Sequence, residues 1–234
     1  MGDEAGPGDR LGLDGRSDMT SQSCSWRAVR FGLALSLVAV VSASCATTGF
    51  QRSSNIADTM AKQTQTIQEA KPQVEAMLAS LDELTQTQGD MRPAFQRFSD
   101  TLDDTEKVAA RTRRTGQTIR EKQADYIAQW QKESAEITNP QIKAATEARQ
   151  AEVRTKLSNL SQTGRTAGDL YDPFISDMRD IRTYLSNDLT PGGVKKIQPT
   201  IEKARQDGAA LLKALDEFNR ASADVQASLR PTGT

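Results

Sequence analysis

Hydrophobic residues recur every three to four positions between residues 53 and 229, and polar residues fill the positions between them. This is the a/d spacing of helices that pack into a bundle or a coiled coil. No alternation of hydrophobic and polar residues long enough for a strand interrupts it. The pattern therefore predicts an all-α chain, and it falls into four long stretches.

Each stretch carries its own stripe of hydrophobic and small residues. The first stripe is Met60, Ile67, Ala70, Val74, Met77, Leu81 and Leu84. The second is Phe95, Phe98, Leu102, Ala109, Ile119, Tyr126 and Trp130. The third is Val153, Leu157, Leu160, Gly164, Ala167, Tyr171, Phe174, Met178, Ile181 and Leu185. The fourth is Val194, Ile197, Ile201, Ala204, Gly208, Leu211, Leu215, Phe218, Val225 and Leu229. Because Gly116 and Gln123 occupy seam positions of the second stripe, we expect the middle of that helix to be its least stable part.

Turn-forming residues separate the stretches. We expect turns at residues 89–90, 139–140 and 187–193, with Thr190 capping the helix that follows the last of them. Short turns between long helices make sequential helices antiparallel. The predicted architecture over residues 53–229 is an elongated antiparallel up-and-down bundle of about four long helices, coiled-coil-like, followed by a disordered tail at 230–234.

Three prolines fall inside the stripes. Pro72 predicts a kink or a break near Lys71. At Pro173 the stripe continues in phase, which predicts a bend rather than a terminus. Pro199 predicts either a kink or the true start of the last long helix.

The segment before the bundle has the layout of a secretion signal. Residues 1–18 are rich in Gly and Asp and lack periodicity, which is typical of a disordered extension. Two arginines and an apolar run over residues 31–41 follow, and small residues come next. The run is shorter than the roughly 20 residues that a membrane-spanning helix needs. We therefore expect residues 1–44 to be an extension plus a lipoprotein-type signal peptide, and we hypothesise that translation starts at Met19.

Cys45 follows this segment directly. Residues 42–45 resemble the lipobox of bacterial lipoproteins, in which a diacylglyceryl thioether forms on the cysteine, although Ser42 stands where that pattern favours Leu. The alternative is ordinary signal-peptidase cleavage, which would leave a lone thiol in an oxidising compartment. We expect Cys45 to be the lipid-attachment residue and residues 45–52 to be a lipidated tether. By analogy with enterobacterial sorting, Ala46 after the cysteine favours the outer membrane.

The composition removes most catalytic chemistry. The chain has no histidine, the commonest general base and metal ligand. No stretch matches a phosphate loop or a dinucleotide fingerprint. The 30 basic residues nearly balance the 31 acidic ones, so no bulk field attracts nucleic acid. We expect no catalytic residue, no cofactor, no metal and no nucleic-acid partner.

Two local groups allow more than one interpretation. Residues 111–114 contain three arginines, the densest basic cluster, and without interleaved aromatic residues they favour a solvated helix face. Contact with anionic headgroups or another envelope polymer is the alternative. Tyr126 and Trp130 lie four positions apart, a spacing that favours a place in the core or the seam over a ligand-stacking pair.

Several short motifs occur in order along roughly residues 55–228. They are Gly89-Asp90-Met91, Val108-Ala109, Tyr126-Ile127-Ala128-Gln129-Trp130 before Glu133, Ile137-Thr138-Asn139, Tyr171-Asp172-Pro173-Phe174 and Tyr184-Leu185-Ser186-Asn187-Asp188-Leu189. With these motifs the chain resembles a bacterial envelope family known as domain of unknown function 2959. Many of its members resemble lipoproteins, which agrees with the interpretation of Cys45. The resemblance implies no assigned activity, and the missing phosphate loop argues against an ATPase role.

These observations favour a non-enzymatic, lipid-anchored helical protein of the bacterial cell envelope with a scaffold or interaction role. Its partners would be a membrane facing the periplasm, through the lipid on Cys45, and a protein or a second copy through helix packing. The alternative is a secreted helical binding module for a lipid or another hydrophobic ligand, with Trp130 and Tyr126 lining the site.

Overall fold

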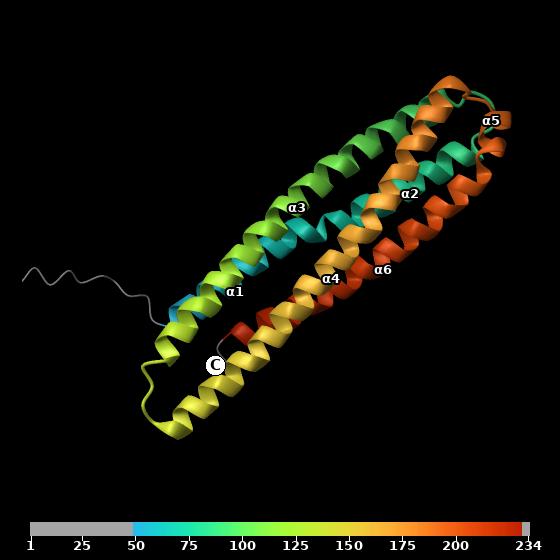
Figure 1. Ribbon diagram of the computed structural model, residues 1–234. Coiled ribbons are helices and arrows are strands. Elements are labelled where there is room, and N and C mark those ends of the chain that lie inside the picture. Colours follow the sequence, from blue (N-terminus) through green and yellow to red (C-terminus); the bar gives the residue numbers. More distant parts are fainter. Residues whose placement is uncertain (1–48, 231–234) are drawn as a thin grey trace, which may run out of the picture. The chain divides into compact units, whose positions relative to one another are not determined.

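The computed structural model of the protein describes residues 49–230. Six helices and no strand occur in this range: α1 (Gly49–Gln68), α2 (Ala70–Gln86), α3 (Arg92–Ser134), α4 (Pro140–Asn187), α5 (Pro191–Lys196) and α6 (Gln198–Leu229) (Figure 1). The predicted extension, the signal peptide and Cys45 lie outside the described residues. The prediction of an all-α fold is confirmed.

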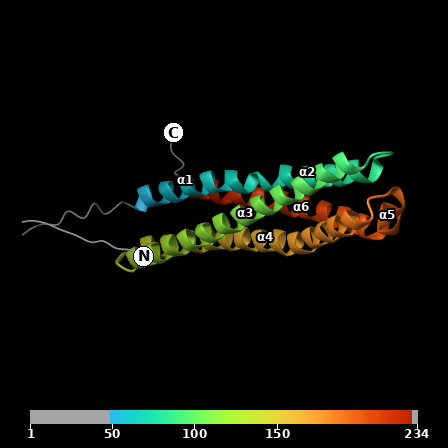
Figure 2. The same ribbon diagram turned by 90° about the horizontal axis from the view of Figure 1, so that it is seen from above.

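The helices form four rods, which are α1 with α2, then α3, then α4, and finally α5 with α6. The rod of α1 and α2 packs against α3 and α6, and α4 packs against α3 and most extensively against α6. Figures 1 and 2 show α3 lying along α1 and α2, and α4 lying along α6. Each rod therefore has its sequence neighbour and one other rod beside it, as in an up-and-down bundle.

Two of the three prolines lie in the first turn of a helix, and the third lies inside one. A break at Glu69 separates α1 from α2, so Pro72 falls in the first turn of α2, where its missing N–H has no helical partner to lose. Helix α4 continues without interruption through Pro173. Pro199 lies in the first turn of α6, which confirms the second of its two interpretations.

The three predicted turns are confirmed. Gly89 has a φ of 91°, a left-handed conformation that favours glycine. The Asn139 side chain accepts hydrogen bonds from two backbone N–H groups in the first turn of α4. The Thr190 hydroxyl accepts one from the backbone N–H of Gly193 at 2.9 Å.

One boundary differs from the expected one. Helix α1 begins at Gly49, so the last four residues of the expected tether 45–52 are helical. Two contacts hold this first part of the helix. Arg52 forms an ion pair with Glu133 on α3, and one turn later Ile56 and Ala57 are buried. The hydrophobic stripe in the sequence begins only at Met60, so it did not predict the helical turns that precede this residue.

The buried hydrophobic residues form two clusters along the bundle. We call core 1 the cluster of Val74, Met77, Leu81, Leu84, Met91, Ala94, Phe98, Leu102, Ala167, Phe174, Ile175, Met178, Ile181, Leu185, Val194, Ile201, Ala204, Leu211, Ala214 and Leu215. We call core 2 the cluster of Ile56, Ala57, Met60, Ile67, Ile119, Val153, Leu157, Leu160, Phe218, Ala221, Val225 and Leu229. Core 1 lies toward the α2–α3 turn and core 2 toward the start of α1.

Four residues of the predicted second stripe are half-buried rather than buried: Phe95, Ala109, Tyr126 and Trp130. Phe95 is half-buried and packs against the side of core 1, because Ala94 and Phe98 take the inward positions. Ala109 is also half-buried, and it lies in a part of α3 that contributes nothing to either core.

No helix among residues 49–230 is long and apolar enough to cross a membrane.

Candidate functional site

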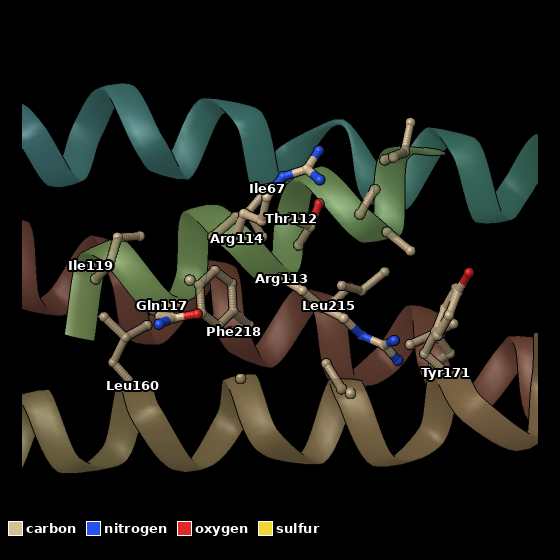
Figure 3. A pocket seen from close by; sticks show the side chains of 18 of the residues that line it. Ile67, Thr112, Arg113, Arg114, Gln117, Ile119, Leu160, Tyr171, Leu215 and Phe218 are labelled. Atoms are coloured by element: carbon tan, nitrogen blue, oxygen red, sulfur yellow. The ribbon is translucent and has the colours of Figure 1, made fainter. Parts of the chain in front are cut away.

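A cavity of about 450 Å³ lies between the four rods, where core 1 gives way to core 2. Side chains from α1, α2, α3, α4 and α6 line it. In Figure 3, Ile67, Leu160 and Phe218 reach into this space from three different helices, and Thr112 comes from α3. The volume falls within the range of about 300–1,000 Å³ that is typical of small-molecule sites.

Small residues on two facing helices create the space. No residue of α3 between Thr105 and Ile119 is buried, because the inward positions there are occupied by Ala109, Thr112 and Gly116. On α4 the cavity is lined by Gly164 and Gly168 among others. A Cβ atom added at Gly168 would meet no other atom within 4 Å, which shows how much space the glycine leaves.

Two polar atoms in the cavity wall have no hydrogen-bond partner. Gln123 is only 6% exposed, and its Nε2 donates to no acceptor. The Thr112 hydroxyl, also buried, is unpaired as well. By contrast, the Thr105 hydroxyl donates to the Thr101 carbonyl at 2.7 Å and accepts from Gln73. A buried donor without a partner costs about 1–3 kcal/mol, so such atoms commonly mark a place where water or a ligand binds.

The exposed part of the lining is basic. Four lining residues are exposed and all belong to α3: Arg113, Arg114, Gln117 and Arg120. No Asp or Glu lines the cavity. Of the three arginines, only Arg113 takes part in an ion pair among residues 49–230, so the charges of Arg114 and Arg120 are not neutralised by a carboxylate there.

Arg113 and Tyr171 form one edge of the cavity. The Arg113 guanidinium pairs with Asp172 and lies over the Tyr171 ring, 5.1 Å from its centroid. Burial raises the pKa of the Tyr171 phenol to about 12, and the nearby Glu106 carboxylate acts in the same direction.

Polar links close the seam between α3 and α4 on both sides of the cavity. Toward core 1 it is closed by three ion pairs, which join Asp103 to Arg182, Glu106 to Arg179 and Asp172 to Arg113. Toward the other end, Gln150 Nε2 donates to Ser134 Oγ. Between Arg113 and Ser134, no hydrogen bond or ion pair joins α3 to α4 in the described part of the chain. The cavity meets this open stretch of the seam.

A dry cavity of this size would be costly. At about 24 cal/mol per Å³, 450 Å³ of empty space would cost about 11 kcal/mol, as much as the whole stability of a typical domain. Because its rim is exposed to solvent, we expect the space to hold water or a molecule with a largely apolar body.

A second cavity of about 530 Å³ lies at the other end of core 2. Tyr126 and Trp130 line it, with their ring centroids 5.7 Å apart, and both pack half-buried against core 2. Their predicted place at the core or seam is confirmed. The wall also contains charged groups, among them Arg52 and Arg149.

The sequence pointed to the second of these two cavities as the ligand site. Tyr126 and Trp130 do not line the apolar cavity, which lies further along the bundle. The signal that marked this cavity was the interruption of the second stripe by Gly116 and Gln123. We interpreted that interruption as a loss of helix stability, whereas in the fold these two residues line an open space.

The basic cluster 111–114 divides between two roles. Arg111 pairs with Glu69, the residue between α1 and α2, at 2.6 Å and does not line the cavity. Arg113 and Arg114 line the cavity instead. Figure 3 shows the Arg113 side chain directed toward Tyr171 and that of Arg114 toward the α1–α2 rod.

Cys45, the predicted lipid-attachment residue, lies outside the described residues. No group of His, Cys, Asp or Glu in the described range is arranged to hold a metal ion.

Comparison with known proteins assigns the family. The family model described as Protein of unknown function (DUF2959) matches residues 43–227, and the chain belongs to this family. Searches of curated proteins and of solved structures found no match to the chain.

Proposed function

From its membership of this family of unknown function, we propose that the protein is a non-enzymatic, lipid-anchored helical bundle of the bacterial cell envelope, with a scaffold or interaction role. The observation that carries the proposal is the start of α1 at Gly49, four residues after Cys45. Four residues span at most about 14 Å, so an acyl group on Cys45 would hold one end of the bundle close to the membrane surface.

The rest of the bundle then extends away from the anchored end. Helix α3 has 43 residues, and at about 1.5 Å per residue it is about 65 Å long. Ile142, in the first turn of α4, is 56% exposed and is the one exposed large hydrophobic side chain among residues 51–230. It lies at the same end as the start of α1, next to the α3–α4 loop, where it would face lipid. The lack of histidine supports a role without catalysis.

Acylation of Cys45 is the test of the anchor. In cells fed a radiolabelled fatty acid, the native chain should carry the label, should accumulate as an unprocessed precursor with globomycin, and should sediment with membranes. Cys45→Ser should abolish both the label and the sedimentation. The control is Ser44→Ala, which keeps a small residue before the cysteine. A native chain that stays soluble and unlabelled contradicts the anchor.

A second candidate function, the binding of a hydrophobic ligand, is favoured by the cavity between the four rods. This function requires no anchor and is compatible with one. It differs from the sequence-based alternative in its site, which moves from Tyr126 and Trp130 to the space beside Gly168 and Phe218.

A further inference from the structure

We propose that the cavity between the rods binds a single-chain amphiphile, an acyl or alkyl chain with one anionic head group, whose head lies at Arg120, the arginine that extends over Gly116 in the cavity wall. The proposal rests on the second candidate function, ligand binding, and is independent of the lipid anchor on Cys45.

The shape of the space favours one flexible chain. A helix about 10 Å across would fill 450 Å³ with roughly one turn, so neither a partner helix nor a second copy of this bundle fits inside. A single alkyl chain needs no such width. It would lie against the buried side chains Ile67, Leu160, Leu215 and Phe218, all of which are less than 9% exposed.

The charges favour an anionic head group. The cavity lining contains three arginines and no carboxylate, although the protein as a whole is nearly neutral. Arg114 and Arg120 have no carboxylate partner among the described residues, and both are exposed at the rim. Guanidinium groups bind carboxylates and phosphates through paired N–H donors. Arg113, already paired with Asp172, would define the edge of the site rather than bind the head.

The unpaired polar atoms favour an acceptor on the ligand. Gln123 is more than nine-tenths buried, lines the cavity, and has an Nε2 without an acceptor. Thr112 lines the same cavity with an unpaired hydroxyl. Thr112 and Gln123 lie about 16 Å apart along α3, so each donor would need its own acceptor, a ligand oxygen for one and a water or a second ligand oxygen for the other.

The route of entry is the open stretch of the α3–α4 seam. It lies between the ion pair of Arg113 with Asp172 and the hydrogen bond of Gln150 to Ser134. Gly164 and Gly168 line the α4 side of the cavity here, and Gln117 and Arg120 line the α3 side. A chain that enters here would break no hydrogen bond or ion pair between the two helices.

Binding is tested on the full chain carrying Cys45→Ser, so that no covalently attached acyl group is mistaken for a bound one. The probe is cis-parinaric acid, an 18-carbon fatty acid whose fluorescence rises in an apolar site. Palmitate, hexadecyl phosphate and hexadecanol are then used to displace it. We expect one site per chain, with displacement by palmitate or the phosphate at least about tenfold stronger than by hexadecanol. The stronger of the two anions identifies the head as a carboxylate or a phosphate.

Two sets of variants locate the site. Gly168→Leu places a side chain in open space within the cavity and should weaken the binding of cis-parinaric acid at least about tenfold. Ala148→Leu, on the exposed face of the same helix, should leave that binding unchanged. Arg120→Gln should weaken the binding of palmitate about tenfold and leave the binding of hexadecanol unchanged. Arg220→Gln, an exposed arginine outside the cavity, is the matched control.

Circular dichroism melting establishes that each variant is folded. Three outcomes would overturn the proposal. The probe does not bind, the native chain and the Gly168→Leu variant bind it equally, or hexadecanol displaces it as strongly as both anions do. None of these depends on whether Cys45 is acylated in cells, so the ligand site and the anchor can fail separately.

Discussion

Core 1 and core 2 are built by the same four rods but differ in how completely their large side chains are buried and in how many buried polar side chains lie beside them. Of the twelve largest side chains that are less than 2% exposed, eleven belong to core 1 and only Met60 belongs to core 2. Buried polar side chains are concentrated along the core 2 half, where they are Thr64, Gln123, Ser134, Gln150 and Ser222. The comparison shows that one half of the bundle is closely packed with large apolar side chains, while the other half contains most of the buried polar side chains and borders an open space.

The largest expected effect comes from removing one phenylalanine from each half. Phe174 in core 1 is fully buried, and Phe174→Ala should cost about 4 kcal/mol of unfolding free energy. Phe218, in core 2, is 8% exposed and already borders the cavity, so Phe218→Ala should cost about 2 kcal/mol. Urea unfolding of the two variants measures the difference. Equal losses would mean that the cavity wall is as tightly packed as core 1.

A methyl group added at two glycines should have opposite effects. At Gly208 a Cβ would lie 2.8 Å from Leu78 Cδ2 and 3.0 Å from the ring of the fully buried Phe174, so Gly208→Ala should destabilise the protein by about 2 kcal/mol. At Gly168 the Cβ meets nothing, and Gly168→Ala should stabilise the helix by up to about 1 kcal/mol. Thermal melting of both variants tests the pair, and a stabilising Gly208→Ala would contradict the close packing of α6 on α2 and α4.

The polar character of core 2 can be measured through one hydrogen bond. The hydroxyls of Thr64 and Ser222 lie 2.7 Å apart in the interior, and Gln226 Nε2 donates to Ser222 Oγ at 3.2 Å. Thr64→Val and Ser222→Ala should each cost about 1–2 kcal/mol, because each removes the short hydrogen bond between the two hydroxyls and leaves the remaining one with only the longer bond from Gln226. The double variant should cost less than the sum, with a coupling of about 1 kcal/mol. If the costs of the two single variants simply add in the double variant, the hydrogen bond between the two hydroxyls contributes nothing to the stability of the fold.

The smallest effect is a change at high pH, where core 1 meets the cavity. The pKa of Tyr171 is raised by burial to about 12, compared with about 10 in an unfolded chain. The folded state therefore holds this proton more tightly, and the stabilisation it gives is complete below pH 10 and is lost as the pH rises toward 12. Tyr171→Phe should reduce this alkaline loss.

Absorbance at 295 nm provides the direct measurement of this ionisation. In the folded native chain one phenol should ionise near pH 12, and that step should be missing from Tyr171→Phe, whereas Tyr184→Phe should keep it. If no ionisation near pH 12 is seen in the native chain, Tyr171 is more open to water than its place beside Arg113 implies.

Much of the fold follows from local signals in the sequence. The stripes predicted the rods, and the turns at Gly89, Asn139 and Thr190 were predicted because each depends on residues a few positions apart. Pro173 was correctly placed within a continuous helix, since the stripe keeps its phase on both sides of it. These features require no knowledge of which rod lies beside which.

The candidate site required that knowledge. The cavity depends on small residues of α3 and α4 lying at the same level, and no pattern within either helix states this. Aromatic residues attracted attention to Tyr126 and Trp130, while the lining is made partly by residues with little or no side chain, such as Gly164 and Gly168. Family membership did not help, because the family has no described function.

The ion pairs along the α3–α4 seam have a consequence for how this family can change in length. Asp103 with Arg182, Glu106 with Arg179 and Arg113 with Asp172 keep a constant register, since each step forward on α3 is matched by an equal step backward on α4. One residue inserted between positions 113 and 134 would turn everything before it by about 100° relative to everything after it. The charges would then lose their partners or the rim arginines would leave the cavity, whereas an insertion in the loop at 135–139 would disturb neither. The spacing of gaps and insertions among relatives is thus as informative about this site as the identity of its residues.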